Sequence, residues 1–575
     1  MARALLSGNE AVARGAYEAG CRFAAAYPGT PSTEILENIA GYRPIDAQWS
    51  PNEKVAFEVA MGASFGGVRS LVAMKHVGLN VAADPLFTSS YVGVNGGFVI
   101  VTADDPGMHS SQNEQDNRRY AKFAKLPCLE PSDSQEAKDF TIQAFKISEQ
   151  FDTPVLLHLT TRICHSKGIV ILGRRQRVRP KRYQKDARKR LIIPAHARVR
   201  HSVVERRLKD LERFSSRTTL NRLERGSSGL GVVTSGVAYQ YAREVFPKAS
   251  ILKIGLSFPF PRQRARRFAR GVEKIFVVEE MEPVLEEELR LAGISVTGKE
   301  RVPLEGELNP EIVHRAFLGK RRDRAAPAAK AARPPVLCPG CPHTGLFYTL
   351  KRLKIGSTGD IGCYTLGALA PLNAMDTCIC MGASIGNALG MEKAIGPEGA
   401  QKMVAVIGDS TFLHSGMTGL LDVVYNRGTT TVIIMDNRTT AMTGHQDHPG
   451  TGRTLKGDPA SMVDLKKICQ ALGVEDVVEV DPHNLKATRQ AVKQAVGRRR
   501  PSVVITRRPC ILSREAGTTA APLSVDAEVC TACGLCLELG CPAIVRQPNG
   551  KALIQQYLCV GCGLCRQVCP RGAIG

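Results

Sequence analysis

The end of the chain carries eight cysteines in two closely similar runs. The first is Cys530-x2-Cys533-x2-Cys536-x4-Cys541 and the second is Cys559-x2-Cys562-x2-Cys565-x3-Cys569, and a proline follows each last cysteine. Three thiolates at this spacing can bind three irons of one cubane, and the fourth thiolate of such a run reaches the neighbouring cluster. The pattern predicts two [4Fe–4S] clusters, one bound by Cys530, Cys533, Cys536 and Cys569, the other by Cys559, Cys562, Cys565 and Cys541.

A zinc ribbon or a pair of disulfides would also use closely spaced cysteines. Zinc needs four ligands per site and gives no reason for a proline after each run. Because the whole pattern occurs twice, it favours clusters and indicates a protein that carries electrons.

A second chemical centre is expected where two predicted strands end. Residues 403–407 lead into Gly408-Asp409-Ser410, and residues 431–435 lead into Asp436-Asn437-Arg438-Thr439. Ligands of parallel α/β sheets sit at the carboxyl ends of strands. A carboxylate and a carboxamide there can share one hard cation, which usually keeps phosphate oxygens as its other ligands. Gly-Asp alone is also a common helix start, but the glycine-rich segment 381–388 supports a phosphate site.

A helix of small residues at 52–63 offers two further carboxylates, Glu53 and Glu58. Either side chain could enter a cleft, and either could instead be a charge that the helix dipole favours. The spacing does not choose between them.

Over its whole length the chain resembles the 2-oxoacid:ferredoxin oxidoreductases, and among them the large (alpha) subunits that act on indolepyruvate. The resemblance rests on the terminal cysteine runs, Gly408-Asp409-Ser410 and the following segments: Leu6-Ser7-Gly8-Asn9-Glu10-Ala11, Tyr27-Pro28-Gly29-Thr30-Pro31-Ser32-Thr33-Glu34, Asn52-Glu53-Lys54-Val55-Ala56, Cys338-Pro339-Gly340-Cys341-Pro342-His343 and Asp436-Asn437-Arg438-Thr439-Thr440-Ala441-Met442-Thr443-Gly444.

The resemblance implies an α/β fold with two doubly wound domains of the thiamine diphosphate (ThDP)-binding type, a transketolase C-terminal-like α/β domain and a C-terminal bacterial-type 2[4Fe–4S] ferredoxin domain. The expected ranges are 1–165 for the pyrimidine-binding domain, 166–228 for a basic connector, 229–318 for the transketolase C-terminal-like domain, 319–335 for a linker, 336–515 for the diphosphate-binding domain and 522–575 for the ferredoxin domain. Strands are expected at 98–103, 154–159, 230–234, 250–254 and 275–278.

The resemblance also implies residue roles. Those assigned to ThDP and Mg²⁺ are Gly408, Asp409, Ser410, Asn437 and the carbonyl of Thr439, with Glu53 at N1′ of the aminopyrimidine. Thr30 would face the substrate carboxylate, although capping of the next helix is an equal interpretation.

Related enzymes bind a further cubane through four cysteines, which Cys338, Cys341, Cys363 and Cys510 could supply here. The same turn could instead place His343 near the cofactor. Cys378, Cys380 and Cys469 stand in apolar contexts and are expected in the core.

The activity that the resemblance implies is oxidative decarboxylation of aryl 2-oxoacids, such as indolepyruvate, with CoA to acyl-CoA and CO2. Electrons would pass through the clusters to ferredoxin, and a smaller beta subunit would complete the enzyme. Two alternatives stay open: the same chemistry on a different 2-oxoacid, and a non-redox ThDP decarboxylase or lyase.

The composition sets further limits. Of the net charge of +23, much lies between residues 174 and 225. No nucleic-acid-binding motif accompanies this stretch, so a solvated connector is favoured over a docking site for an acidic carrier. No apolar run could span a bilayer and no secretory signal is evident. Ten cysteines outside the tail without a disulfide framework fit a cytoplasmic protein.

Overall fold

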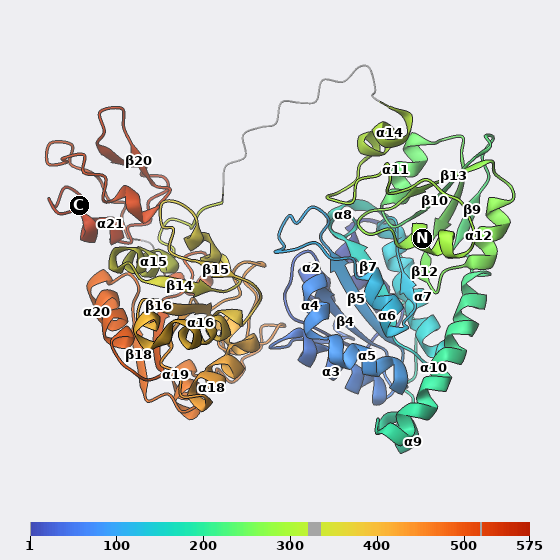
Figure 1. Cartoon of the computed structure of the whole chain (residues 1–575), viewed down its shortest axis with the longest axis horizontal. Coiled ribbons are helices and arrows are strands. Elements are labelled where there is room, and N and C mark those ends of the chain that lie inside the picture. Colours follow the sequence, from blue (N-terminus) through green and yellow to red (C-terminus); the bar gives the residue numbers. More distant parts are fainter. Residues whose placement is uncertain (1, 184, 320–334, 518–519) are drawn as a thin grey trace. The chain divides into compact units, whose positions relative to one another are not determined.

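The computed structural model describes residues 2–183, 185–319, 335–517 and 520–575. They belong to two compact units, 1–326 and 327–575 (Figure 1). Apart from its two end residues, the linker expected at 319–335 lies outside the described residues.

The first unit is built on a seven-stranded sheet of order β12-β6-β7-β5-β4-β2-β3. Strands β5 (Phe98–Asp104) and β7 (Val155–Thr160) are buried along their whole length, as expected for parallel strands that are covered on both faces. Strand β4 (Ser70–Lys75) lies between β5 and β2 (Phe23–Ala26), and β3 (Asp46–Trp49) forms the edge. Because β2 and β4 run parallel, the residues that follow them lie together at the carboxyl-terminal end of the strands.

A second sheet of order β13-β10-β11-β9 follows in the same unit. Its parallel strands are β10 (Leu230–Ser235), β11 (Ser250–Ile254) and β13 (Lys274–Val278). Strand β12 (Leu256–Phe258) follows β11 in the chain but pairs with β6 (Cys128–Leu129) of the first sheet. This exchange ties the two α/β regions together.

The helices of the first unit are α1 (Gly8–Glu18), α2 (Thr33–Ala40), α3 (Glu53–Phe65), α4 (His76–Val81), α5 (Ala83–Val92), α6 (Arg118–Ala124), α7 (Ser134–Phe151), α8 (Thr161–His165), α9 (Ala187–Arg190), α10 (Pro194–Ser215), α11 (Ala238–Val245), α12 (Arg262–Ala269), α13 (Val284–Leu291) and α14 (Pro310–Leu318).

The basic stretch 166–228 is more than the connector that its composition predicts. Its first residues form β8 (Lys167–Ile171), which pairs antiparallel with β1 (Arg3–Ser7). Its last residues form β9 (Arg222–Glu224), which joins the second sheet. Both ends of the stretch are therefore built into the folded unit.

Part of the positive charge in this stretch has a structural role. On α10, Arg207 Nη1 donates to the carbonyl of Ser90 and Arg200 Nε to that of Tyr91. Both carbonyls lie in the last turn of α5, where the helix dipole favours cations.

The second unit contains a six-stranded sheet of order β15-β14-β16-β17-β19-β18, whose neighbouring strands all pair in parallel. Its central strands β16 (Met403–Gly408) and β17 (Thr431–Asp436) extend one residue beyond the predicted strands. The outer strands are β14 (Gly356–Gly359), β15 (Thr377–Cys378), β18 (Asp476–Val480) and β19 (Ser502–Arg507). Its α-helices are α15 (Pro342–Leu353), α16 (Ala383–Ala400), α17 (Asp409–Thr411), α18 (Met417–Tyr425), α19 (Leu465–Ala471), α20 (Leu485–Val496) and α21 (Leu564–Val568).

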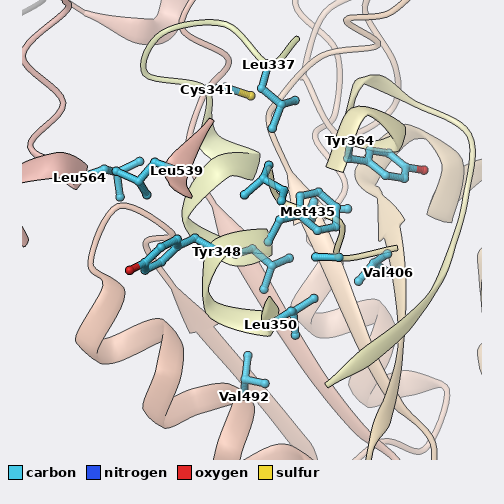
Figure 2. Packing of buried hydrophobic residues seen from close by; sticks show 14 of the residues in the cluster. Leu337, Cys341, Tyr348, Leu350, Tyr364, Val406, Met435, Val492, Leu539 and Leu564 are labelled. Atoms are coloured by element: carbon cyan, nitrogen blue, oxygen red, sulfur yellow. The ribbon is translucent and has the colours of Figure 1, made fainter. Parts of the chain in front are cut away.

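The cysteine-rich tail, which includes the hairpin β20 (Ile544–Arg546) and β21 (Ala552–Ile554), shares a core with this sheet. Leu539 and Leu564 of the tail belong to the same buried cluster as Tyr348 of α15 (Figure 2). Since burial of one such apolar side chain contributes about 1.5–3 kcal/mol, hydrophobic packing holds the tail on the α/β domain. Among the described residues, no helix combines the length and apolarity needed to cross a bilayer.

Candidate functional site

Three oxygen-bearing groups meet where β16 and β17 end. The outer amide atom of Asn437 lies 3.2 Å from Asp409 Oδ1 and 2.8 Å from the carbonyl oxygen of Thr439. With Asn437 Oδ1 in that position, three oxygens face one another, which is unfavourable unless a cation lies among them. With the amide nitrogen there, both distances become hydrogen bonds. All three residues are buried, and the donor set is the one that Mg²⁺ prefers.

The Asp409 carboxylate is held in place from several sides. The amides of Ser410 and Arg438 each donate to it at 2.9 Å, and His448 Nε2 lies 3.2 Å from Oδ2. Burial opposes the charged imidazole, but Asp409 outweighs it and raises the pKa of His448. Burial, with Asp409 beside it, raises the pKa of the neighbouring Asp436 to about 6. Asp409 therefore stays ionised and can act as a ligand.

The loops around this point are held by two buried side chains. A Cβ at Gly408 would lie 2.7 Å from Cε1 of Tyr364, so only glycine fits there. Asp360 is fully buried, and its Oδ2 accepts from the amides of Gly382 and Ser384 at 3.0 and 3.1 Å. This carboxylate orients the glycine-rich entry into α16.

The tail thiols gather in the two groups that their spacing predicts. Burial raises the pKa of Cys536, and the thiols of Cys530, Cys533 and Cys569 raise it further. These four cysteines line one hollow.

In the second group, burial raises the pKa of Cys565 to about 12, and Cys562, Cys541 and Cys559 add to that shift. These four cysteines line another hollow. Four thiolates this close together repel one another unless a cation lies among them. Iron binds cysteine as the thiolate, so each group suits an iron–sulfur cluster.

Cys338, Cys341, Cys363 and Cys510 also come together, although they lie far apart in the sequence. Burial raises the pKa of Cys341, and the other three thiols raise it further. The amide of Cys510 donates to the carbonyl of Asn437 at 2.9 Å. This third group, which the sequence left as one of two readings, therefore adjoins the oxygen site.

The turn that carries Cys338 and Cys341 also buries His343, so both sequence interpretations of it are compatible with the structure. The His343 ring packs edge-on against Tyr364, with centroids 5.8 Å apart. Burial lowers the pKa of His343 to about 4, although Asp409 acts in the opposite direction. A neutral imidazole thus lies within electrostatic reach of the oxygen site.

The expectation that Cys378 and Cys380 are core residues is wrong, because Cys380 is exposed and Cys378 is half-buried. Cys378 ends β15, which lies at the edge of the sheet, and Cys380 lies in the loop between β15 and α16, where the sheet does not cover it. Cys469 is buried as expected.

In the first unit the two candidate glutamates of α3 differ. Glu53 is the first residue of the helix, directly after the N-cap Asn52, and is 5% exposed. Its Oε1 lies 2.6 Å from the position that a Cβ on Gly78 would take, so it rests against α4. Glu58 is 41% exposed and pairs with Lys54. Only Glu53 is enclosed by the fold.

Thr30 does not cap the following helix, because α2 begins at Thr33 and its N-cap is Ser32. Thr30 is half-buried in the turn that follows β2. The sequence did not identify His448 or Asp360, since each is a single polar residue in a loop without a recurring motif around it.

Comparisons with known proteins agree with this arrangement. Residues 14–222 match the family described as pyruvate flavodoxin/ferredoxin oxidoreductase, thiamine diP-binding. Residues 360–506 match the C-terminal TPP-binding domain of thiamine pyrophosphate enzymes, and residues 552–575 match the 4Fe-4S binding domain. The predicted α/β fold with ThDP-binding domains and a ferredoxin-type tail is thereby confirmed.

Among curated proteins, the indolepyruvate oxidoreductase subunit IorA of Archaeoglobus fulgidus is 40% identical over 100% of this chain and 97% of its own length. The IorA subunit of Methanothermobacter thermautotrophicus is 42% identical over 99% and 96%. A solved 2-oxoglutarate:ferredoxin oxidoreductase from Magnetococcus marinus is 17% identical, with a TM-score of 0.44 over 54% of this chain and 64% of its own, too low to support an inference. The chain therefore belongs to the IorA family of 2-oxoacid:ferredoxin oxidoreductases, enzymes that depend on ThDP and iron–sulfur clusters.

Proposed function

We propose that this chain is the catalytic alpha subunit of an enzyme that oxidatively decarboxylates aryl 2-oxoacids, indolepyruvate among them. In the proposed reaction, one 2-oxoacid, one CoA and two oxidised ferredoxins yield one acyl-CoA, one CO2, two reduced ferredoxins and a proton. The carbon–carboxylate bond breaks, a carbon–sulfur bond forms, and two electrons leave for ferredoxin.

The observation that carries the proposal is the direct link between the oxygen site and a thiol group, the Cys510 amide bonded to the Asn437 carbonyl at 2.9 Å. A decarboxylase without redox function would need the oxygen site but no thiols beside it. The contact thus favours chemistry in which electrons leave from the cofactor.

The oxygen site is assigned to Mg²⁺ and the cofactor diphosphate. Asp409, Asn437 and the Thr439 carbonyl would be its protein ligands, as their converging oxygens favour. Gly408 and Ser410 would line the diphosphate, and Glu53 would hydrogen-bond N1′ of the aminopyrimidine. When bound, ThDP supplies the electron sink that lets CO2 leave.

The three thiol groups are assigned to three [4Fe–4S] clusters. The third group, Cys338, Cys341, Cys363 and Cys510, adjoins the oxygen site. Cys338 and Gly340 line the same hollow as the second group, Cys541, Cys559, Cys562 and Cys565. The first group, Cys530, Cys533, Cys536 and Cys569, would pass electrons to ferredoxin.

The proposed substrate and partners are inferred from the similar proteins. Subunits that cover nearly the same length are named for indolepyruvate. Those names contain the word subunit, and the domains of this chain are those expected of an alpha subunit. Both observations support a smaller beta subunit that completes the enzyme.

The decisive experiment is anaerobic purification with the co-expressed beta subunit. We expect about one ThDP and about 12 irons per chain, the sum of three cubanes with four irons each. Assays with CoA, methyl viologen and a panel of 2-oxoacids should give the highest kcat/KM with an aryl substrate. Aldehyde release without viologen reduction would instead support the decarboxylase alternative, and a preference for pyruvate or 2-oxoglutarate would change the substrate class.

A matched pair of variants tests the proposed role of Glu53. Glu53→Gln should lower kcat by about 10²–10⁴-fold, the usual loss for a general acid–base group. Glu58→Gln, on the same helix but exposed, should stay within about twofold of wild type. If both substitutions lowered kcat equally, the result would contradict a catalytic role for Glu53.

A further inference from the structure

Lys75 ends β4 and is the N-cap residue of α4. Since β4 pairs with β2, its last residue and the turn after β2 leave the same edge of the sheet. The two are in contact: a Cβ at Gly29 would lie 2.9 Å from Lys75 Cβ and 3.8 Å from its Cδ. The aliphatic part of Lys75 therefore runs along the turn that contains Thr30.

Lys75 is also close to the enclosed glutamate. Glu53 rests against Gly78, which follows Lys75 by three residues, less than one helical turn. A half-buried cation, a hydroxyl-bearing turn and a buried carboxylate thus share one region of the first unit.

No described carboxylate forms an ion pair with the Lys75 ammonium. Lys75 Nζ donates to the carbonyl of Ser110 at 2.7 Å. Asp105, the carboxylate that acts electrostatically on Lys75, accepts from Ser110 N, Ser111 Oγ and Thr161 Oγ1 instead. Burial lowers the pKa of Lys75 to about 8. Burial destabilises the charged form of Lys75, and a bound anion would stabilise it again.

We propose that Lys75 binds the carboxylate of the 2-oxoacid substrate beside the Thr30 turn. This rests on the proposed function and deepens it by adding a substrate-binding residue. An ammonium suits a carboxylate because a charge-assisted hydrogen bond is about twice as strong as a neutral one. CoA phosphates are the competing anions, and the test separates them.

The test uses the purified, cofactor-loaded enzyme and the variants Lys75→Met, Lys75→Arg and, as control, Lys146→Met, an exposed lysine of α7. Lys75→Met should raise KM for the 2-oxoacid by about 10–100-fold, the range for loss of a hydrogen bond to a charged group. The KM for CoA should not change. Lys75→Arg should keep most of the affinity, and Lys146→Met should match wild type.

Calorimetric binding of indole-3-propionate and of its neutral amide supplies a readout independent of turnover. Lys75→Met should weaken the carboxylate by about 10–100-fold and leave the amide within about twofold. Wild-type affinity for the carboxylate should fall as pH rises above about 8, where the free lysine loses its proton, and Lys75→Met should show no such fall. In the described part of the chain, Asp105 raises the pKa of Lys75, and Lys75 in turn lowers that of His76, so these are the titratable groups to be considered with it.

Equal loss of affinity for carboxylate and amide, which a merely structural lysine would cause, would overturn the inference. So would a raised KM for CoA instead of the 2-oxoacid, or wild-type binding that does not prefer the carboxylate. If wild type turns over 2-oxoacids and Lys75→Met equals it, only this inference fails. If wild type shows no such turnover, the proposed function fails, while the binding comparison still decides the role of Lys75.

Discussion

The two units differ in the polar groups that gather in their interiors. In the first unit buried ions are paired with each other: Arg118 with Asp116 at 2.5 Å and with Glu279 at 3.0 Å, and His158 with Asp104 at 2.7 Å. In the second unit groups of one kind converge, as the oxygens and the thiols of the candidate cofactor sites do.

The difference indicates what each unit requires to be stable. Paired ions compensate each other's loss of hydration, whereas converging thiols and oxygens need a metal. One oxygen of Asp104, one oxygen of Asp116 and one ring nitrogen of His158 all lie within 4.8 Å of one another, a spacing that could hold a metal ion. Since Arg118 already binds Asp116 and His158 binds Asp104, these side chains compensate one another. We therefore expect the first unit to be stable without metal and the second to depend on it.

Iron removal should produce the largest effect. Metal-centred domains draw about 10 kcal/mol or more of folding free energy from their metals, so the apo protein should lose protection from hydrogen exchange in α15 and the tail. The fluorescence of Trp49, the only tryptophan of the chain, reports the first unit and should show an unchanged urea transition. If iron removal also shifted the Trp49 urea transition, the first unit would depend on metal too, which would contradict the difference between the units.

The substitution Asp409→Ala should have the next largest effect. It removes the only charged oxygen among the three proposed Mg²⁺ ligands, and we expect about a 10³-fold or greater loss of turnover, or about 4 kcal/mol. The purified variant should retain iron but lose ThDP, which chemical assay of both would show. Asp422→Ala, at an exposed carboxylate of α18, is the control and should retain both cofactors.

Arg118→Met should destabilise the first unit by about 3–5 kcal/mol, because it leaves Asp116 and Glu279 buried without their cation. The neighbouring Arg119 is 36% exposed where it pairs with Glu282 and Glu287. Arg119→Met should therefore cost at most about 1 kcal/mol. Urea unfolding followed by Trp49 fluorescence measures both, and equal costs would contradict the role given to the buried pairs.

The smallest effect is the change in stability of the first unit over a single pH unit. Burial opposes the charge of His158, but Asp104 and Glu130 outweigh it and raise the pKa of His158 to about 10. A raised folded-state pKa adds stability that is full below about 6.5 and is lost as pH rises towards 10. The difference in unfolding free energy between wild type and His158→Gln should shrink over that window by at most about 1.4 kcal/mol per pH unit. A pH-independent difference would show that His158 is neutral when folded.

What could be predicted from sequence follows a physical pattern. The strands at 98–103, 230–234, 250–254, 403–407 and 431–435 appear within a residue or two of their expected ends, because continuous apolar runs bounded by turn residues mark buried parallel strands. The tail cysteines gather in the expected groups because two-residue spacing on a tight loop leaves them little choice of neighbour.

The predicted strands, the family and the residue types of the candidate cofactor sites followed from the amino-acid sequence, since these depend on local spacing and on long segments of similar residues. Only the tertiary structure enclosed Glu53 rather than Glu58, brought Cys510 to Asn437, exposed Cys380 and laid Lys75 along the Gly29 turn. Each of these depends on residues that are distant in the chain and meet only when strands pair and helices pack, and local composition contains no information about such contacts.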